Sequence, residues 1–137
     1  SNCYGRLLGG RASFVDHLQT NLAAGRAVPG FTDQWRTSTA GDQLPEIVGR
    51  LLAAPDLQGV FHWGGADRIT RHDAALTYCR VMGYDERLVH PLRAADRDFL
   101  APRPRDTSLD SSRLAAAIGL APVRLEAGFA AIKAGRP

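Results

Sequence analysis

The sequence predicts an α/β protein, and three observations support that prediction. Ser13 and Thr70 each stand three residues before an aspartate, a spacing typical of residues that cap the start of a helix. Apolar residues recur every three or four positions after these caps, which gives each predicted helix one face for burial. Short apolar runs with β-branched and aromatic residues separate the helical segments. Helices that alternate with short strands favour a layered architecture.

Five segments are predicted to be helical. Gly25, Gly83 and Gly119 follow three of them, where glycine commonly ends a helix. Pro45 falls in the first turn of the second helix, where proline is tolerated. Asp110 is the predicted cap of the fourth. The five predicted helices cover residues 14–24, 42–55, 71–82, 111–118 and 125–132.

Only two or three strands can be predicted. Residues 28–32 form a brief strand and turn, residues 59–63 form a buried strand before Gly64 and Gly65, and residues 88–91 form an edge strand. So small a sheet is a poor scaffold, and such strands usually extend a larger sheet. The chain also starts without methionine. We therefore expect the larger sheet to come from sequence upstream of Ser1.

Length and composition narrow the class of protein. The 137 residues suffice for one domain, and 45% hydrophobic with 23% charged residues is ordinary for a globular protein. No apolar run approaches the ~20 residues that cross a membrane, and no signal peptide is visible. Cys3 and Cys79 are far apart and indicate neither a zinc site nor a disulfide framework. We expect a cytoplasmic protein without a membrane partner.

The basic character of the chain does not indicate a nucleic-acid partner. The net charge is +3 and the pI is about 9.3, yet the sixteen arginines and one lysine are scattered. Such an arginine bias is also typical of a GC-rich genome. The histidines form no HExxH motif, and no GxSxG motif is present. His62, in an apolar run, is predicted to be a hydrogen-bonded core histidine.

Several short motifs occur together in an order that resembles one family. They are Ser1-Asn2-Cys3-Tyr4-Gly5, then Asp33-Gln34-Trp35-Arg36-Thr37-Ser38-Thr39, Gly59-Val60-Phe61-His62 with Gly64-Gly65, Arg103-Pro104 with Asp106, Leu109-Asp110-Ser111-Ser112-Arg113, and Ile118-Gly119-Leu120. The chain resembles the C-terminal, substrate-binding lobe of the extended short-chain dehydrogenases. Within them it is most similar to the dTDP-4-dehydrorhamnose reductases and related epimerases and dehydratases. Ser38 stands where those reductases have proline.

The resemblance implies a small α/β lobe, residues 1–137, of an NAD(P)-binding protein whose Rossmann lobe is mostly absent. It implies a nucleotide sugar as ligand, and NAD or NADP bound by the missing N-terminal lobe of the complete protein. The chain has no GxGxxG motif after a strand and no YxxxK motif. We therefore expect no catalytic residue, and no cofactor bound by this chain alone. A homo-oligomer is compatible with the family.

Four residues are predicted to bind the substrate. The resemblance places Asn2, Arg36 and Arg103 near the diphosphate, which favours guanidinium and amide donors. Thr39 is the fourth, as a hydroxyl in the same segment as Arg36. Each has a plainer interpretation: Asn2 as a hydrogen bonder at a strand end, the arginines as surface residues, and Thr39 as part of a loop that leads into a helix. Trp35 is predicted to pack, or to flank a ligand base.

Two functions remain open at this stage. The first is the substrate-binding part of an NAD(P)-dependent sugar-nucleotide oxidoreductase. The second is a non-catalytic module, because the family includes relatives such as the regulatory subunit of methionine adenosyltransferase. A glycine fingerprint and a YxxxK pair upstream of Ser1 would favour the enzyme.

Overall fold

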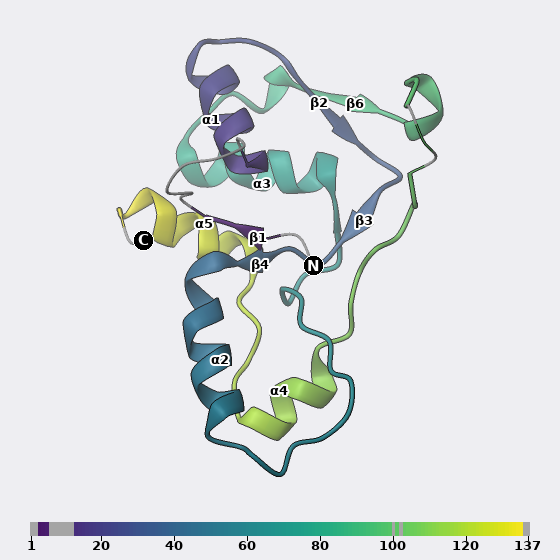
Figure 1. Ribbon diagram of the computed structural model, residues 1–137. Helices are drawn as coiled ribbons and strands as arrows, with labels where there is room; N and C mark the ends of the chain where they lie inside the picture. Colours follow the sequence, from purple (N-terminus) through teal and green to yellow (C-terminus); the bar gives the residue numbers. More distant parts are fainter. Residues whose placement is uncertain (1–2, 6–12, 100, 102, 136–137) are drawn as a thin grey trace.

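The computed structural model describes residues 3–5, 13–99, 101 and 103–135 (Figure 1). Helices α1 (Phe14–Ala23) and α3 (Arg71–Met82) lie at one end of the molecule, and helices α2 (Leu44–Leu52) and α4 (Ser112–Ile118) lie at the other. Helix α5 (Leu125–Lys133) lies between them and packs against α3. The predicted α/β class is therefore confirmed for the described residues.

The strands are more numerous and shorter than the sequence suggests. The six described strands form three separate pairs: β1 (Cys3–Tyr4) parallel to β4 (Thr39–Ala40), β2 (Val28–Phe31) parallel to β6 (Val89–Leu92), and β3 (Trp35–Arg36) antiparallel to β5 (Ile69–Thr70). β2 and β6 correspond to two of the predicted strands. The other four strands are only two residues long, too short for a periodic pattern to indicate them.

The predicted buried strand at residues 59–63 is wrong. These residues form no strand, Val60 is 75% exposed, and His62 is exposed rather than in the core. Phe61 and Trp63 instead lie half-buried against a small apolar cluster formed by α2 and α4. The apolar character of the run therefore reflects packing under helices, which periodicity alone cannot separate from a buried strand.

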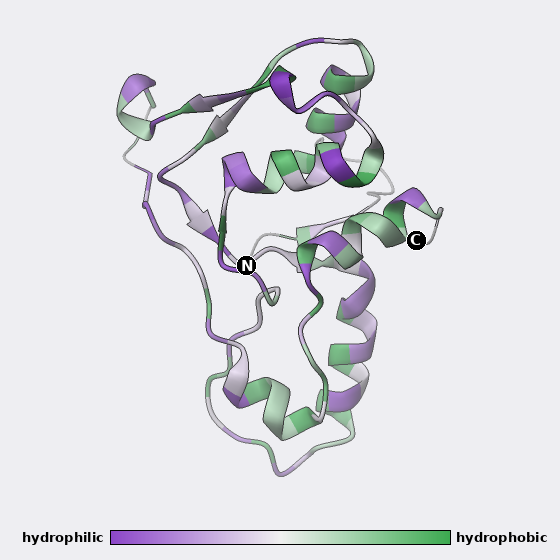
Figure 2. Cartoon of the chain, turned by 180° about the vertical axis from the view of Figure 1, so that it is seen from behind, coloured by the Kyte–Doolittle hydropathy of each residue, from purple (hydrophilic) through white to green (hydrophobic). Residues whose placement is uncertain are grey.

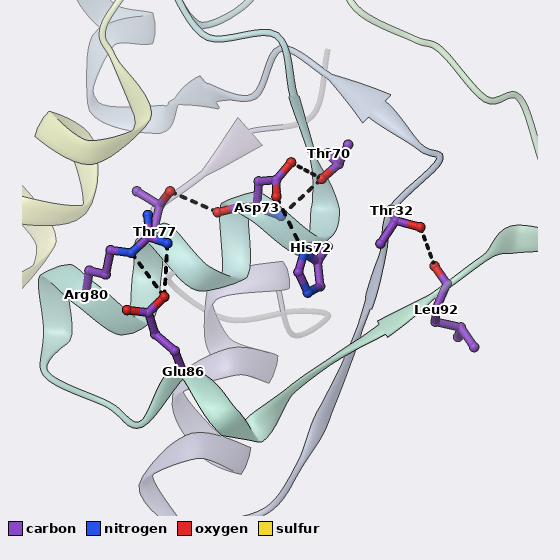
Figure 3. Close-up of polar contacts among 8 residues, drawn as sticks. All are labelled: Thr32, Thr70, His72, Asp73, Thr77, Arg80, Glu86 and Leu92. Carbon is purple, nitrogen blue, oxygen red and sulfur yellow. Dashed lines mark hydrogen bonds and ion pairs between the residues drawn. The ribbon is translucent and has the colours of Figure 1, made fainter.

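The helix caps form close to where the sequence places them. The Asp16 N–H donates to Ser13 Oγ (3.1 Å) and the Ser13 N–H donates to Asp16 Oδ2 (2.7 Å), which is the predicted capping box. At α3 the Asp73 N–H donates to Thr70 Oγ1 (3.0 Å), and the Thr70 hydroxyl donates to the Asp73 carboxylate (Figure 3). This cap makes Arg71 the first residue of α3.

Two helix starts differ slightly from the prediction. A 3-10 turn, Gly41–Gln43, precedes α2, which begins at Leu44 with Pro45 in its first turn. Helix α4 begins at Ser112, and Asp110 Oδ1 accepts from the Ser112 N–H (2.9 Å). Asp110 therefore satisfies a free N–H at the start of α4, as predicted, from just outside the helix.

Helix α3 is the centre of the main core. Its residues Ala74, Ala75, Tyr78 and Cys79 are buried, and it contacts α5, β2 and β6. Phe129 of α5 is 0% exposed beneath it. Ile47, Leu114 and Ile118 form a second, smaller cluster at the α2 and α4 end. No helix within the described ranges is long and apolar enough to cross a membrane.

One apolar stripe of α2 faces away from both clusters. Leu44, Val48 and Leu52 are spaced four residues apart and are 40%, 53% and 80% exposed, whereas Ile47, on the neighbouring face of the helix, is 5% exposed. Figure 2 shows hydrophobic and hydrophilic residues alternating along this helix. By contrast, the predicted apolar face of α1 is covered, because Val15, Leu18 and Leu22 are all buried by this chain. The uncovered surface is therefore concentrated on α2.

We predict that the isolated 137-residue chain self-associates through α2, because contiguous exposed apolar surface favours association. Leu52→Glu should reduce association seen by light scattering. Since Leu52 is already in water, the free energy of unfolding should change by less than about 0.5 kcal/mol.

The matched control is Ile47→Glu on the buried face of the same helix. It should destabilise the chain by about 3 kcal/mol or more, because it buries an unpaired charge. A parent chain that is a monodisperse monomer with no dye-accessible apolar surface would contradict the prediction.

Candidate functional site

Two neighbouring cavities share a wall formed by Phe14, Arg36 and Arg71. The apolar cavity has a volume of about 240 Å³ and is lined further by Tyr4, Ile69, Ala74, Leu125 and Phe129. The basic cavity has a volume of about 250 Å³ and is lined further by His17, Phe31, Gln34, Arg97, Phe99 and Arg103. Both lie at the end of α3 that begins with Arg71.

The pairing of β3 with β5 brings the two shared arginines together. Arg36 lies opposite Ile69, and Trp35 lies opposite Thr70. Arg71 follows Thr70 directly, and its backbone N–H donates to the Gln34 carbonyl (3.3 Å). The Thr70 cap then turns the chain into α3 (Figure 3). Two residues about 35 positions apart in sequence are thereby fixed at one place.

The arginines at the cavities lack the carboxylate partners that others have. Elsewhere in the described chain, some arginines pair with acidic groups, for example Arg50 with Glu46 (2.7 Å) and Arg80 with Glu86 (3.0 Å), although others do not. Among the described lining residues of either cavity there is no aspartate or glutamate. Burial lowers the pKa of Arg71, and the positive charges of Arg36 and Arg103 lower it further. The site therefore concentrates positive charge that an anion would neutralise.

Buried hydrogen-bond donors at the basic cavity lack a partner within the described residues. Gln34 is 3% exposed and its Nε2 makes no hydrogen bond, and the buried Nε of Arg36 makes none either. Arg36 is held from its other end, where Nη1 donates to Thr107 Oγ1 (3.0 Å). Buried donors are nearly always satisfied in proteins, so unpaired ones at a cavity are available to an acceptor on a ligand or on water.

The segment that carries Arg103 is tied to β3. The Trp35 N–H donates to the Arg105 carbonyl (2.7 Å), and the Thr107 N–H donates to the Trp35 carbonyl (3.1 Å). Arg68 lies 4.3 Å above the Trp35 ring and pairs with Asp106 (2.6 Å). Trp35 lines neither cavity, so in this structure it packs rather than flanking a ligand base.

The predicted site residues have different outcomes. Arg36 and Arg103 line the same basic cavity. Thr39 does not join them: it lies in β4 and is 1% exposed, because its pairing with Cys3 of β1 places it inside the fold. Asn2 lies outside the described residues.

Gln34 and Arg71 are among the cavity residues that were not predicted as site residues. Gln34 stands two positions before Arg36, in the same quoted motif, and Arg71 directly follows the predicted cap Thr70. Their proximity depends on the β3–β5 pairing, for which a two-residue strand gives no sequence signal. The only signals available were their adjacency to Arg36 and to a helix start.

The family of the chain follows from comparison with known proteins. A family model described as the RmlD substrate binding domain matches residues 1–134. The chain belongs to this family. The RmlD substrate-binding domain is the family that the motif order predicted, so that prediction is confirmed.

A curated relative supports the assignment. The probable low-salt glycan biosynthesis reductase Agl14 of Haloferax volcanii is 34% identical over 121 residues, which cover 88% of this chain and 40% of that protein. The chain therefore spans about two fifths of the length of this relative. Agl14 is described as a reductase, and the remaining part of it has no counterpart in the 137 residues.

Solved structures of three dTDP-4-dehydrorhamnose reductases share the fold. The enzyme from Bacillus anthracis, in complex with NADP, has a TM-score of 0.80 at 16% identity, and the match covers 98% of this chain and 46% of that one. The enzyme from Clostridium acetobutylicum has a TM-score of 0.79 at 21% identity, and the match covers 95% of this chain and 44% of that one. The enzyme from Yersinia enterocolitica has a TM-score of 0.77 at 18% identity, and the match covers 94% of this chain and 45% of that one. The predicted α/β fold of the substrate-binding lobe is confirmed, and it matches less than half of each of these longer chains.

Asp106 gives a pH-dependent prediction for this RmlD substrate-binding domain. Hydrogen bonds from Ser108 and from Arg68 lower the pKa of Asp106 to about 2. A carboxylate with a lowered pKa stabilises the folded state above its ordinary value near 3.9, and that contribution is lost as the pH falls toward 2. Asp106→Asn should therefore flatten the fall in melting temperature between about pH 4 and about pH 2.

Circular dichroism melts at several pH values measure this effect. Asp56→Asn is the control, because Asp56 is exposed in the turn after α2. Its profile should run parallel to that of the parent. An Asp106→Asn profile that is also parallel to the parent would contradict the role given to Asp106.

Proposed function

We propose that residues 1–137 form the substrate-binding lobe of an NAD(P)-dependent sugar-nucleotide reductase. Family membership, the reductase relative and the fold shared with dTDP-4-dehydrorhamnose reductases support this proposal. The ligand is a nucleoside diphosphate sugar. The nicotinamide cofactor belongs to a second, N-terminal lobe that this chain does not contain.

The arginine cluster carries the proposal. A nucleotide sugar presents two phosphates, which favour guanidinium groups, and a flat base, which favours aromatic surfaces. The basic cavity offers both: Arg36 and Arg103 line it, and Phe31 and Phe99 stand with ring centroids 5.6 Å apart. We assign the diphosphate to the arginines and the base to the two phenylalanines. The sugar would then extend toward the apolar cavity that shares Arg36.

The two remaining predicted residues receive different proposals. Asn2 precedes Cys3, which lines the apolar cavity, so we retain it as a donor to the diphosphate. Thr39 is buried in β4, and we propose that it supports the fold beneath the site instead of touching the ligand.

This chain is proposed to bind and orient the substrate while another lobe performs the chemistry. The cofactor supplies the hydride in reductases of this kind. Tyr4 lines the apolar cavity, but burial, with a smaller contribution from the charges of Asp42 and Asp67, raises its pKa well above the usual value. The Lys133 ammonium donates to the Val81 carbonyl (2.6 Å) on the surface. Tyr4 would therefore stay protonated, without a lysine to acidify it.

The site assignment predicts the effect of two substitutions in the complete protein. Arg36→Ala or Arg103→Ala should weaken sugar-nucleotide binding by roughly ten- to a hundredfold, because each removes a charge-assisted contact. NADPH affinity should stay within about twofold of the parent, since the cofactor belongs to the other lobe. Arg105→Ala is the control: its side chain is exposed and lines neither cavity.

Calorimetric titration of dTDP-sugar and NADPH measures both affinities. Unchanged sugar-nucleotide binding in both arginine variants would overturn the site assignment. A complete protein that binds the sugar nucleotide but transfers no hydride from NADPH would favour the regulatory alternative over the reductase.

A further prediction concerns the cofactor. The isolated chain should not bind NADPH, because it has no glycine-rich phosphate loop after a strand. Titration calorimetry on the isolated chain, with the complete protein as the positive control, tests this. Micromolar binding to the isolated chain would show that the division of labour between lobes is wrong.

A further inference from the structure

Arg71 occupies the wall between the two cavities, a position that no predicted site residue except Arg36 shares. Its backbone is fixed on both sides. Its own N–H donates to the Gln34 carbonyl, and Thr70 before it caps α3 through Asp73 (Figure 3). The position of the Arg71 Cα, at the first residue of a 12-residue helix, is therefore fixed by these hydrogen bonds.

The Arg71 guanidinium is also held in place and left without a counter-ion. It lies 4.9 Å from the centre of the Phe14 ring, which also forms part of the shared wall. Within the described part of the chain it makes no ion pair. Arg80, later on the same helix, is instead exposed and paired with Glu86. A structural surface arginine would be expected to resemble Arg80.

The surroundings of Arg71 disfavour its positive charge. Burial lowers its pKa, and the charges of Arg36 and Arg103 lower it further, so like charges surround this group without compensation. The ionisable residues that line the basic cavity together with Arg71 are His17 of α1, Arg36 of β3, and Arg97 and Arg103 from the segment after β6. All four are basic residues. Buried Gln34 Nε2 and Arg36 Nε add unpartnered donors beside it, within the described residues.

We propose that Arg71 is a third diphosphate-contacting residue, which makes the site prefer nucleoside diphosphates to nucleoside monophosphates. The inference rests on the proposed function and refines it. Arg103 with Arg36 meets one phosphate in the basic cavity, and Arg71 with Arg36 meets the next at the shared wall. A monophosphate has no group to place at Arg71.

The test compares ligands that differ by one phosphate on the complete protein. Binding of dTDP and dTMP is measured by titration calorimetry for the parent and for Arg71→Met, which keeps the apolar stem over Phe14 but removes the charge. The dTDP affinity should fall by roughly tenfold or more while the dTMP affinity changes by less than about threefold. Arg71→Lys should restore part of the preference, since it returns the charge without the planar fork.

A melting experiment and two further variants separate a binding role of Arg71 from a structural one. Without ligand, Arg71→Met should melt at or above the parent temperature, because it removes an uncompensated charge; a clear drop would indicate a structural residue and overturn the proposal. Arg80→Met on the same helix should leave both affinities unchanged. Arg36→Met should weaken both ligands, because Arg36 is assigned to both phosphates, whereas Arg71 is assigned to the second one alone.

The outcomes distinguish this inference from the proposed function. If the parent binds dTDP and Arg36→Met weakens it, but Arg71→Met keeps the parent ratio of dTDP to dTMP affinity, only the role of Arg71 is wrong. If the parent binds neither dTDP nor dTMP, the proposed function fails, and the role of Arg71 fails with it.

Discussion

The packing of Phe129 between two tyrosines is the contact on which the rest of the structure depends. The Phe129 ring packs edge-on against both tyrosines, with its centroid 5.3 Å from that of Tyr4 and 5.2 Å from that of Tyr78. Phe129 is wholly buried. These three rings join β1, α3 and α5, which come from the beginning, middle and end of the described chain. Gly128 allows the approach, because a Cβ there would collide with the Tyr4 hydroxyl. The apolar cavity is the space beside this contact, with Tyr4 and Phe129 in its wall.

The same packing determines where the charged groups lie. Helix α3, held by Tyr78 at its middle, directs its first residue, Arg71, toward β3, where Arg36 stands. The segment that carries Arg103 is then bound to β3 through the backbone of Trp35. The fold thus brings three like charges near each other, and an anionic ligand would offset their mutual repulsion. This is the reason that a basic cavity lies directly beside an apolar one.

Features that depend on neighbouring residues could be predicted from the sequence, and features that depend on distant ones could not. The Ser13 and Thr70 caps and the helices after them follow from spacings of three residues, and the structure has them. The strand expected at residues 59–63 is absent, because its apolar residues pack under α2 and α4. Arg36 and Arg103 were predicted through resemblance, whereas the position of Arg71 and Gln34 beside them depends on the β3–β5 pairing, which no local pattern encodes.

The described chain leaves two physical requirements unmet, and they call for different partners. The arginine cluster needs negative charge, which a small ligand can supply, whereas the Leu44, Val48 and Leu52 stripe of α2 needs apolar cover, which only a protein surface can supply. The two are connected by a short stretch of backbone. β4 pairs with β1 beside the apolar cavity and continues through Gly41–Gln43 into α2. The strand pair next to the site and the exposed apolar stripe of α2 are therefore parts of one continuous segment of the chain.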